Sequence, residues 1–428
     1  MRVLHVLHTS LPFICGYSIR SDYILRYQRE QGFEPAAVVT SGQQPPSAAE
    51  REEIDGVSYF RTPPAPEGGL KVPFGREAAL MRMLAGRVAD AIRETRPHLV
   101  HAHSPMLVGL PALWAARRAG LPLVYEIRDL WENASVDRGK FSPSSPLYKA
   151  ARGAEGVVLR NANAVVTICE SLRAELAPRV AQSGALSVVA NGVDTERFVP
   201  RPKNPEFARK YGLEGKRVVG YVGTFQPYEG LEVLVRAMTE ITRALPDARL
   251  VITGAGGEEP RLRQVAAEQK LGEHVVFTGR LPHDQVFDVY ALADLLVYPR
   301  LLTRTTALTT PLKPLEAMAM ARAVMVSDVP AMRELVKEGH TGMVFRAGDQ
   351  AHLAARCVEL LSDEARRRSL GAAAREFVVA ERRWPVLVER YQRIYESALG
   401  APLDLKPPRP ADGAARPAAQ AQASGGAS

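Results

Sequence analysis

The sequence predicts an α/β protein with two doubly wound, Rossmann-like domains that face a central cleft. Short apolar runs alternate with longer amphipathic stretches along most of the chain, as expected for parallel strands joined by helices. The length of 428 residues is too great for one ordinary core and suits two. An Asn-Gly turn signal at 191–192 and a proline-bearing stretch at 199–205 divide two series of strands. We therefore predict one domain over 1–198 and a second over 199–380.

The first domain is predicted to begin with a buried strand at the N-terminus and to continue as strand and helix in turn. Its longest helix is expected over 77–95, where an apolar residue recurs every four positions from Leu80 to Ile92, with arginines between. A shorter helix is expected over 23–30. The predicted strands are 3–7, 36–40, 98–102, 121–126, 164–168 and 187–190.

The second domain repeats this pattern, with a cleft between the domains as the predicted site. In doubly wound folds, ligands bind at the carboxyl ends of the strands. A last helix over 381–400 is predicted to return to the first domain. The tail 401–428 is rich in Ala, Pro, Gly and Ser and is predicted to be disordered. The predicted strands are 218–222, 249–253, 275–278, 295–298 and 324–327.

Composition narrows the classes of function. Apolar residues make up 46% and charged residues 24%, and no run approaches the roughly 18 apolar residues of a membrane span. Three widely separated cysteines offer neither a disulfide framework nor a metal clip, which indicates a reducing, cytoplasmic setting. The net charge of +8 fits an anionic membrane or a phosphorylated substrate. Since no nucleic-acid motif accompanies the charge, no nucleic-acid partner is predicted.

The most informative stretch follows the fourth predicted strand of the second domain. This loop contains Arg300 and Arg304, and a helix is expected to open near Pro314, directly after Lys313. Backbone N–H groups at a helix start and basic side chains both bind phosphate. Glu316 falls in the first helical turn, where its carboxylate either stabilises the helix dipole or accepts hydrogen bonds from ribose hydroxyls.

This stretch resembles the donor-binding segment of retaining GT-B glycosyltransferases of family four. The similarity is carried by residues 311–320, 324–328 and 333–336, and it extends to about residue 400. Similarity to the subgroup found beside exosortase-linked exopolysaccharide clusters is carried by 10–12, 16–21, 101–105, 125–132 and 298–300. The resemblance implies transfer of a sugar, with retention, from a nucleoside diphosphate donor to a glycan or lipid-linked acceptor in surface polysaccharide synthesis.

Three positions depart from the family pattern. Thr224 and Glu229 stand where members carry an Arg and a Lys that hold the diphosphate, and Leu308 stands where the first glutamate of a paired motif is expected. The donor's charge must then be met by the three cations named above and by backbone amides. The resemblance implies these donor-binding residues: Gly223, Thr224, Arg300, Arg304, Thr310, Leu312, Lys313, Leu315 and Glu316.

The first domain is expected to supply the acceptor site. His103 follows a buried strand, where the resemblance puts an active-site histidine near the transferred sugar, although a lone histidine is more often structural. Asp129 follows the next strand and is predicted as an acceptor ligand or proton relay, unless it forms a local ion pair with Arg128. The implied catalytic residues are His103, Asp129 and Glu316, and the implied acceptor contacts are Gly16, Tyr17, Arg20 and Arg128.

Three further expectations concern metals, other classes of function and membranes. No Asp-x-Asp motif occurs in the chain, so no metal or cofactor is predicted. Because family cations and one glutamate are missing, a non-catalytic sugar-nucleotide-binding regulatory protein stays open, as does a nucleotide-sugar epimerase. Five arginines on the amphipathic segment 75–96 favour either peripheral contact with the anionic inner face of the cytoplasmic membrane or a solvated helix face.

Overall fold

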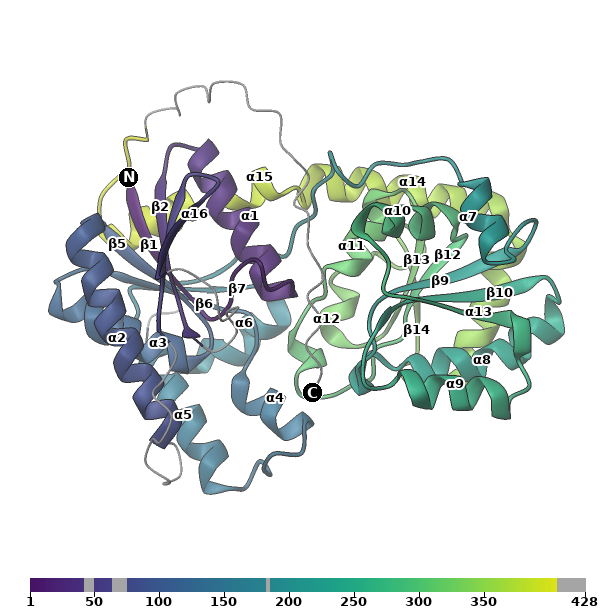
Figure 1. Cartoon of the computed structure of the whole chain (residues 1–428), viewed down its shortest axis with the longest axis horizontal. Coiled ribbons are helices and arrows are strands. Elements are labelled where there is room, and N and C mark those ends of the chain that lie inside the picture. The colour runs from purple at the N-terminus through teal and green to yellow at the C-terminus, as the bar shows by residue number, and fades with distance from the viewer. Residues whose placement is uncertain (42–49, 64–74, 182–184, 406–428) are drawn as a thin grey trace.

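The computed structural model describes residues 1–41, 50–63, 75–181 and 185–405, which form two α/β domains (Figure 1). The first sheet has eight strands in the order β3-β4-β2-β1-β5-β6-β7-β8. Neighbouring strands are parallel except β3 and β4, which form an antiparallel hairpin at the edge. The strands are β1 (Arg2–Leu7), β2 (Glu34–Val39), β3 (Arg51–Ile54), β4 (Val57–Arg61), β5 (Leu99–His103), β6 (Leu123–Ile127), β7 (Ala164–Thr167) and β8 (Leu186–Val188).

Helices cover both faces of the first sheet. One face carries α2 (Gly75–Thr95), α3 (Met106–Arg118) and α5 (Pro146–Asn161), whose apolar sides form one core with the strands. The other face carries α1 (Gly16–Glu30) and the C-terminal α15 (Trp384–Val388) and α16 (Arg390–Leu399). Two short helices, α4 (Trp131–Asp137) and α6 (Glu170–Leu176), follow the carboxyl ends of β6 and β7.

The second sheet is fully parallel, with six strands in the order β11-β10-β9-β12-β13-β14. Figure 1 shows α8, α9 and α13 on one face and α10, α11 and α14 on the other. Strands are β9 (Arg217–Thr224), β10 (Ala248–Ala255), β11 (Val275–Gly279), β12 (Leu295–Tyr298), β13 (Ala323–Ser327) and β14 (Met343–Phe345). Helices are α7 (Pro205–Lys210), α8 (Leu231–Ala244), α9 (Glu259–Glu268), α10 (His283–Leu292), α11 (Lys313–Ala319), α12 (Pro330–Arg333), α13 (Gln350–Ser362) and α14 (Glu364–Glu381).

The chain crosses between the two cores twice. Ala190 still packs in the first core, whereas Val193 and Phe198 already pack in the second, so the first crossing lies a few residues before the predicted boundary at 198. After α14 the chain returns, and Trp384 and Tyr395 are fully buried against the first sheet. Residues 401–405 continue along that core, with Leu403 and Leu405 packed on it. The predicted disordered tail otherwise lies outside the described residues.

The predicted two-domain α/β fold is confirmed, and each predicted strand has a counterpart within about two residues. Three short strands were not predicted: the β3–β4 hairpin and β14. The segment 77–95 forms α2, with Leu84 and Val88 buried against the sheet. Among the described helices, none combines the length and the apolar character that a membrane span requires.

Candidate active site

The carboxyl ends of β1, β5 and β6 meet near the start of α1, and a Tyr–Asp pair lies there. The Tyr17 hydroxyl donates to Asp129 Oδ1 and lies 3.4 Å from Ser104 Oγ. Burial raises the pKa of the Asp129 carboxyl and of the Tyr17 hydroxyl. A poorly solvated carboxylate oriented by a tyrosine is suited to accept a hydrogen bond or a proton from a sugar hydroxyl.

Asp129 also lies at the boundary with the second domain. The pKa of Tyr228, in the loop after β9, is raised first by burial, and the Asp129 charge is among the other causes. At the end of α4, Asp137 Oδ2 accepts from the Thr305 backbone N–H at 2.8 Å. Gly16 is exposed at the start of α1, and a Cβ there would meet no atom within 4 Å. The packing of the protein therefore leaves room for a side chain at this position and does not itself require glycine.

Beneath this edge, Glu126 of β6 is fully buried between two arginines. Glu126 Oε1 accepts from Arg20 Nε at 3.0 Å and from Arg128 Nε at 2.8 Å. The Tyr391 hydroxyl of α16 donates to the other carboxylate oxygen. Burial alone would raise the pKa of Glu126, but Arg20 and Arg128 hold it well below its usual range.

The other guanidinium nitrogens of both arginines form hydrogen bonds inside the domain. Arg20 donates to the carbonyls of Val189 and Ala190, and Arg128 donates to the Tyr17 carbonyl. The two side chains belong to residues only 1% and 3% exposed. The predicted acceptor contacts of Arg20 and Arg128 are therefore corrected to an internal role: they neutralise Glu126. The alternative ion pair of Arg128 with Asp129 is likewise replaced by the pair with Glu126.

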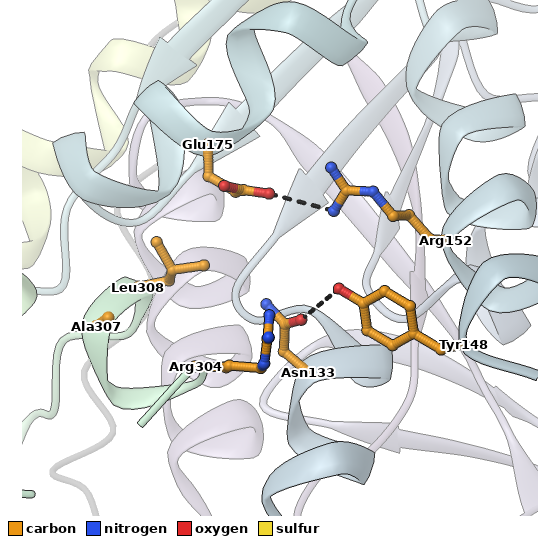
Figure 2. Close-up of a pocket in the computed structure, with 7 residues that line it drawn as sticks. All are labelled: Asn133, Tyr148, Arg152, Glu175, Arg304, Ala307 and Leu308. Atoms are coloured by element: carbon orange, nitrogen blue, oxygen red, sulfur yellow. Dashed lines mark hydrogen bonds and ion pairs between the residues drawn. The ribbon is translucent and has the colours of Figure 1, made fainter. Parts of the chain in front are cut away.

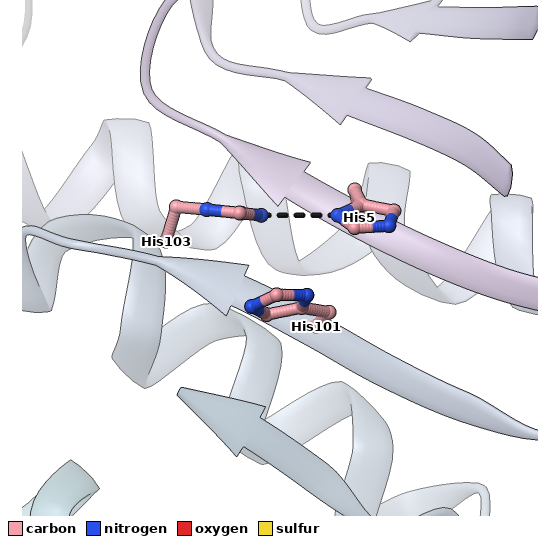
Figure 3. A group of neighbouring side chains, drawn as sticks. All are labelled: His5, His101 and His103. Atoms are coloured by element: carbon pink, nitrogen blue, oxygen red, sulfur yellow. Dashed lines mark hydrogen bonds between the residues drawn. The ribbon is translucent and has the colours of Figure 1, made fainter. Parts of the chain in front are cut away.

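The predicted catalytic residue His103 also points into the first domain. Side chains alternate across a strand, so His101 and His103 of β5 lie on the same face as His5 of β1, under α1 and α16 (Figure 3). His103 is 1% exposed. Its Nε2 lies 3.0 Å from His5 Nδ1, and its Nδ1 lies 2.7 Å from Arg128 Nη2. Both ring nitrogens are thus occupied, and the imidazole does not reach the cleft.

One assignment of protons satisfies this chain of contacts. Arg128 Nη2 donates to His103 Nδ1, and His103 Nε2 donates to His5 Nδ1. His5 Nε2 then donates to Gln28 Oε1 at 2.8 Å. Gln28 Nε2 donates to the Tyr395 hydroxyl, which donates to Nδ1 of the remaining histidine. All three imidazoles are neutral in this chain, and burial accordingly lowers the pKa of His5 to about 3 and that of His103 to about 4.

The three histidines have the spacing of a metal site, with candidate ligand nitrogens within 4.8 Å of one another. Two observations favour the hydrogen-bonded chain over a bound cation. A cation would have to break the bond between His5 and His103, and it would face the guanidinium groups of Arg20 and Arg128, which already flank Glu126. Metal independence itself stays a prediction.

In the second domain, the first turn of α11 brings Lys313 and Glu316 together. Lys313 Nζ lies 3.1 Å from Glu316 Oε2, and the Tyr290 hydroxyl donates to the same oxygen at 2.8 Å. Glu316 is 8% exposed, whereas the Lys313 side chain is 39% exposed. The Tyr298 hydroxyl donates to the Lys313 carbonyl and fixes the start of the helix. This pair offers an open ammonium group beside a held carboxylate, as a nucleotide ribose and diphosphate would require.

Arg300 is paired with Glu229, the residue that stands where family members carry a lysine. The two groups form a bidentate pair with distances of 2.7 and 3.1 Å, and Arg300 Nη1 also donates to the Thr309 carbonyl. Arg300 is 8% exposed. The prediction of Arg300 as an open phosphate cation is therefore corrected: Glu229 balances its charge, and the pair joins the loops after β9 and β12. Gly230 permits this approach, since its φ is 69° and a Cβ there would lie 2.0 Å from the Pro299 carbonyl oxygen.

The other predicted donor residues are divided between the cleft and the interior. Arg304 and Thr224 are exposed, and Gly223 is partly exposed beside Thr224. Leu315 is fully buried and its N–H donates to the Leu312 carbonyl, so it has no free group for a donor. The side chain of Leu312 packs on the first-domain core.

Direct contacts hold the two domains together at this site. Asn191 Nδ2 donates to both the carbonyl and Oγ1 of Thr310, at 2.8 and 3.1 Å, so Thr310 serves the interface. Glu334 accepts from the backbone N–H groups of Glu170 and Ser171, each at 2.7 Å, at the start of α6. Ala331 of α12 is fully buried within the first-domain core. The first-domain edge and the α11 segment therefore face one packed boundary.

Comparison with known families agrees with this architecture. A profile described as "Glycosyl transferase 4-like domain" matches residues 16–192, and one described as "Glycosyl transferases group 1" matches residues 203–377. The chain is a GT-B glycosyltransferase of family four. This assignment replaces the open alternatives of an epimerase and a non-catalytic binding protein.

Relatives cover nearly the whole glycosyltransferase. A GDP-mannose-dependent alpha-mannosyltransferase of Mycolicibacterium smegmatis is 29% identical over 404 residues, covering 94% of this chain and 98% of the relative. The sulfoquinovosyl transferase of Arabidopsis thaliana is 27% identical, covering 87% and 69%. Among solved structures, sucrose-phosphate synthase of Thermosynechococcus elongatus superposes with a TM-score of 0.76 at 20% identity, covering 93% and 99%. Anabaena HepE in complex with UDP gives 0.72 at 17% identity, covering 93% and 100%.

Several residues that shape the site were not predicted. Glu126 is the hub of the first-domain network, and a glutamate inside the apolar run 123–127 is a signal that a buried partner exists. Gln28, Tyr391 and Tyr395 join that network from helices distant in sequence. No local pattern reveals them, because their contacts depend on how α1 and α16 pack on the sheet.

Proposed function

We propose that the enzyme transfers a mannosyl group from GDP-mannose, with retention at the anomeric carbon, to an acceptor used in surface polysaccharide synthesis. The donor is inferred from relatives named as GDP-mannose-dependent, which match along almost the full chain. Retention and the exopolysaccharide role rest on the family resemblance. The observation that carries the proposal is that both pairs, Tyr17–Asp129 and Lys313–Glu316, lie at the packed boundary between the domains: the Asp129 charge reaches Tyr228 of the second domain, and Leu312, next to Lys313, packs on the first-domain core.

In this proposal each domain has a separate task. Glu316 accepts hydrogen bonds from the ribose, while Lys313 meets the charge of the diphosphate as it departs. Asp129, oriented by Tyr17, accepts a hydrogen bond from the attacking acceptor hydroxyl. His103 acts through Arg128 as a positioning residue, because its ring does not reach the cleft.

A donor panel tests the proposal. The full-length chain is incubated with GDP-mannose, UDP-glucose, UDP-N-acetylglucosamine or ADP-glucose and with membrane extract, in buffer with and without EDTA. We expect transfer from GDP-mannose above the other donors, undiminished by EDTA, and an α-configured product by NMR. Binding of GDP without transfer from any donor, or a β-configured product, would contradict the proposed reaction.

We further propose that the enzyme works at the inner face of the cytoplasmic membrane on a lipid-linked acceptor. Between α2 and α3 lies a groove of about 650 Å³ that includes Arg82 and the half-exposed Trp114. Arg118 lies 5.0 Å from the centre of the Trp114 ring. An exposed indole beside cations suits a lipid headgroup layer. Arg87, by contrast, is half-buried, lies over the Phe60 ring and does not line this groove.

A further inference from the structure

A cavity of about 400 Å³ lies between the two domains, beside the edge that carries Asp129 (Figure 2). Its volume falls within the range of about 300–1,000 Å³ found for small-molecule sites. None of its first-domain residues was predicted from the sequence. It is lined by Asn133, Tyr148, Arg152 and Glu175 of the first domain and by Arg304, Ala307 and Leu308 of the second.

The polar lining contains both hydrogen-bond donors and acceptors, and contacts between them hold them in place. The Tyr148 hydroxyl donates to Asn133 Oδ1 at 3.0 Å, which orients the amide and leaves Nδ2 to donate elsewhere. Arg152 Nη1 lies 3.2 Å from Glu175 Oε1, so that ion pair offers both guanidinium donors and carboxylate acceptors. Figure 2 shows the two pairs facing each other across the cavity.

The second domain completes the cavity with one cation and an apolar wall. Arg304 is exposed, and among the described residues no hydrogen bond or ion pair joins its guanidinium group to a partner. Ala307 and Leu308 add an apolar surface. The loop is anchored without a ligand, because the Thr305 N–H donates to Asp137 and the Cys169 thiol donates to the Leu308 carbonyl at 3.1 Å.

This combination distinguishes a sugar from an anion. A sugar ring presents hydroxyls, which donate and accept, around an apolar face, and the cavity offers amide, carboxylate, guanidinium and apolar groups together. A phosphate accepts only, and the Glu175 carboxylate in the lining would repel it. The partner of Arg152 therefore argues against a phosphate subsite.

We propose that this cavity binds a non-reacting sugar ring of the acceptor, so the acceptor is an oligosaccharide and not a single sugar. The proposal rests on the proposed function, since it assigns the acceptor of the same reaction. Asn133 lies on α4, the helix that begins two residues after Asp129, so a ring in the cavity leaves the next ring near the Tyr17–Asp129 pair. Since both domains line the cavity, a bound acceptor also stabilises their packed arrangement.

Binding of small saccharides to the full-length chain with saturating GDP tests this. The probes are disaccharides (mannobioses, maltose, cellobiose, lactose, chitobiose), the corresponding monosaccharides and inorganic phosphate, followed by saturation-transfer NMR and calorimetry. We expect at least one disaccharide to bind about 10-fold more tightly than its monosaccharide, and this gain to be lost in Arg304→Ala and in Asn133→Ala. Arg173→Ala, which removes an exposed arginine of α6, is the matched control and should keep the gain.

The outcomes separate this inference from the proposed function. Because Arg304 is exposed, Arg304→Ala should fold even if Asn133→Ala does not, and GDP affinity reports on the fold of both. If GDP binds but no disaccharide exceeds its monosaccharide, or if the variants leave the gain intact, the subsite is overturned. Phosphate binding that is lost in Arg304→Ala overturns it also, in favour of an anion site. Failure of the proposed function appears instead in the donor panel, as absence of transfer from every donor.

Discussion

Two arginines of the first domain near the cleft are neutralised by one buried carboxylate, whereas the second domain keeps a partly exposed lysine ammonium group. Arg20 and Arg128 share Glu126 in the interior. In the second domain, Arg300 is neutralised by Glu229, but Lys313 remains more than a third exposed. Buried ion pairs orient neighbouring groups, and only a partly solvated cation can exchange its water for a diphosphate. Under the proposed function, the first domain uses its charge to hold the edge that receives the acceptor, and the second uses its charge to bind the donor.

The largest effect is expected from breaking the first-domain network. Glu126→Gln leaves two buried guanidinium groups without a carboxylate, and the loss of unfolding free energy should be about 3–5 kcal/mol. Urea denaturation measures it. Glu364→Gln, at an exposed position on α14, is the control and should change stability by less than about 0.5 kcal/mol. A loss as small as that of the control would show that Glu126 does not neutralise Arg20 and Arg128.

The pair of Arg300 and Glu229 comes next, and a double-mutant cycle sharpens the comparison. Arg300→Met and Glu229→Gln each leave one buried charge unpaired, whereas the double variant leaves none. We expect the double variant to be more stable than the sum of the single losses predicts, by about 1–3 kcal/mol. Additive losses would contradict the compensating pair. GDP affinity should persist in any variant that folds, because Arg300 does not face the nucleotide.

Lys313→Ala tests the open cation of the second domain. The variant should lose about 1.5–3 kcal/mol of binding free energy for GDP, as for a hydrogen bond to a charged group, and little for guanosine. Calorimetry with the two ligands measures the difference. Lys140→Ala, at an exposed lysine of the first domain, is the control. Equal losses for GDP and guanosine would place Lys313 away from the diphosphate.

The buried histidines predict an acid-sensitive first domain. From the ordinary value of 6.5, burial lowers the pKa of His103 to about 4 and that of His101 well below. Between pH 6.5 and 4 the unfolded chain therefore binds protons that the folded chain refuses, and each histidine removes up to about 1.4 kcal/mol of stability per pH unit. Glu155 acts oppositely, since burial raises its pKa to about 8 and the folded state takes up that proton first.

Comparing variants that all retain Glu155 cancels the opposing contribution of that residue to the pH dependence. In His101→Asn the fall of stability from pH 6.5 to 5 should be smaller than in the wild type by about 1.4 kcal/mol per unit. His340→Asn, at an exposed histidine of the second domain, should follow the wild-type curve. Parallel curves for all three proteins would show that His101 is not held neutral by burial. Urea denaturation at each pH provides the measurement.

The apolar runs in the sequence were sufficient to predict the central strands of both sheets, because parallel strands covered on both faces are continuous apolar runs. The β3–β4 hairpin was missed although a signal was present: Asp55 and Gly56 form its turn, with φ of 49° and 72°. β14 is three residues long and has no period to detect. Asp129 was predicted to face the cleft because it directly follows a strand, and it lies at the domain boundary.

The same rule failed for His103, because it ignores which face of the strand a side chain occupies. His101 and His103 are two residues apart on one strand, so the pleat alone indicates that they share one face, and the register of β1 against β5 adds His5 to it. That this face is covered by Tyr391 and Tyr395 could not be predicted, since those residues arrive from the other end of the chain. The ion pairs of Arg20 and Arg300 likewise join segments far apart in sequence.

The smallest expected effect concerns membrane binding and compares two sides of α2, the one that lines the exposed groove and the one that packs near Phe60. Arg82 and Trp114 line the groove between α2 and α3, whereas Arg87 of α2 is half-buried and lies over the Phe60 ring. Each basic residue near an anionic surface contributes about 1 kcal/mol, so Arg82→Glu should weaken co-sedimentation with vesicles of phosphatidylglycerol by roughly 5–30-fold at low salt. Trp114→Ala should weaken it by a smaller factor that salt does not change, because the indole contributes apolar area. Arg263→Glu, at an exposed arginine of α9 in the second domain, is the control and should leave vesicle binding unchanged. Vesicle binding by the wild type that is insensitive to salt and to Arg82→Glu would remove the electrostatic basis for attachment through this groove.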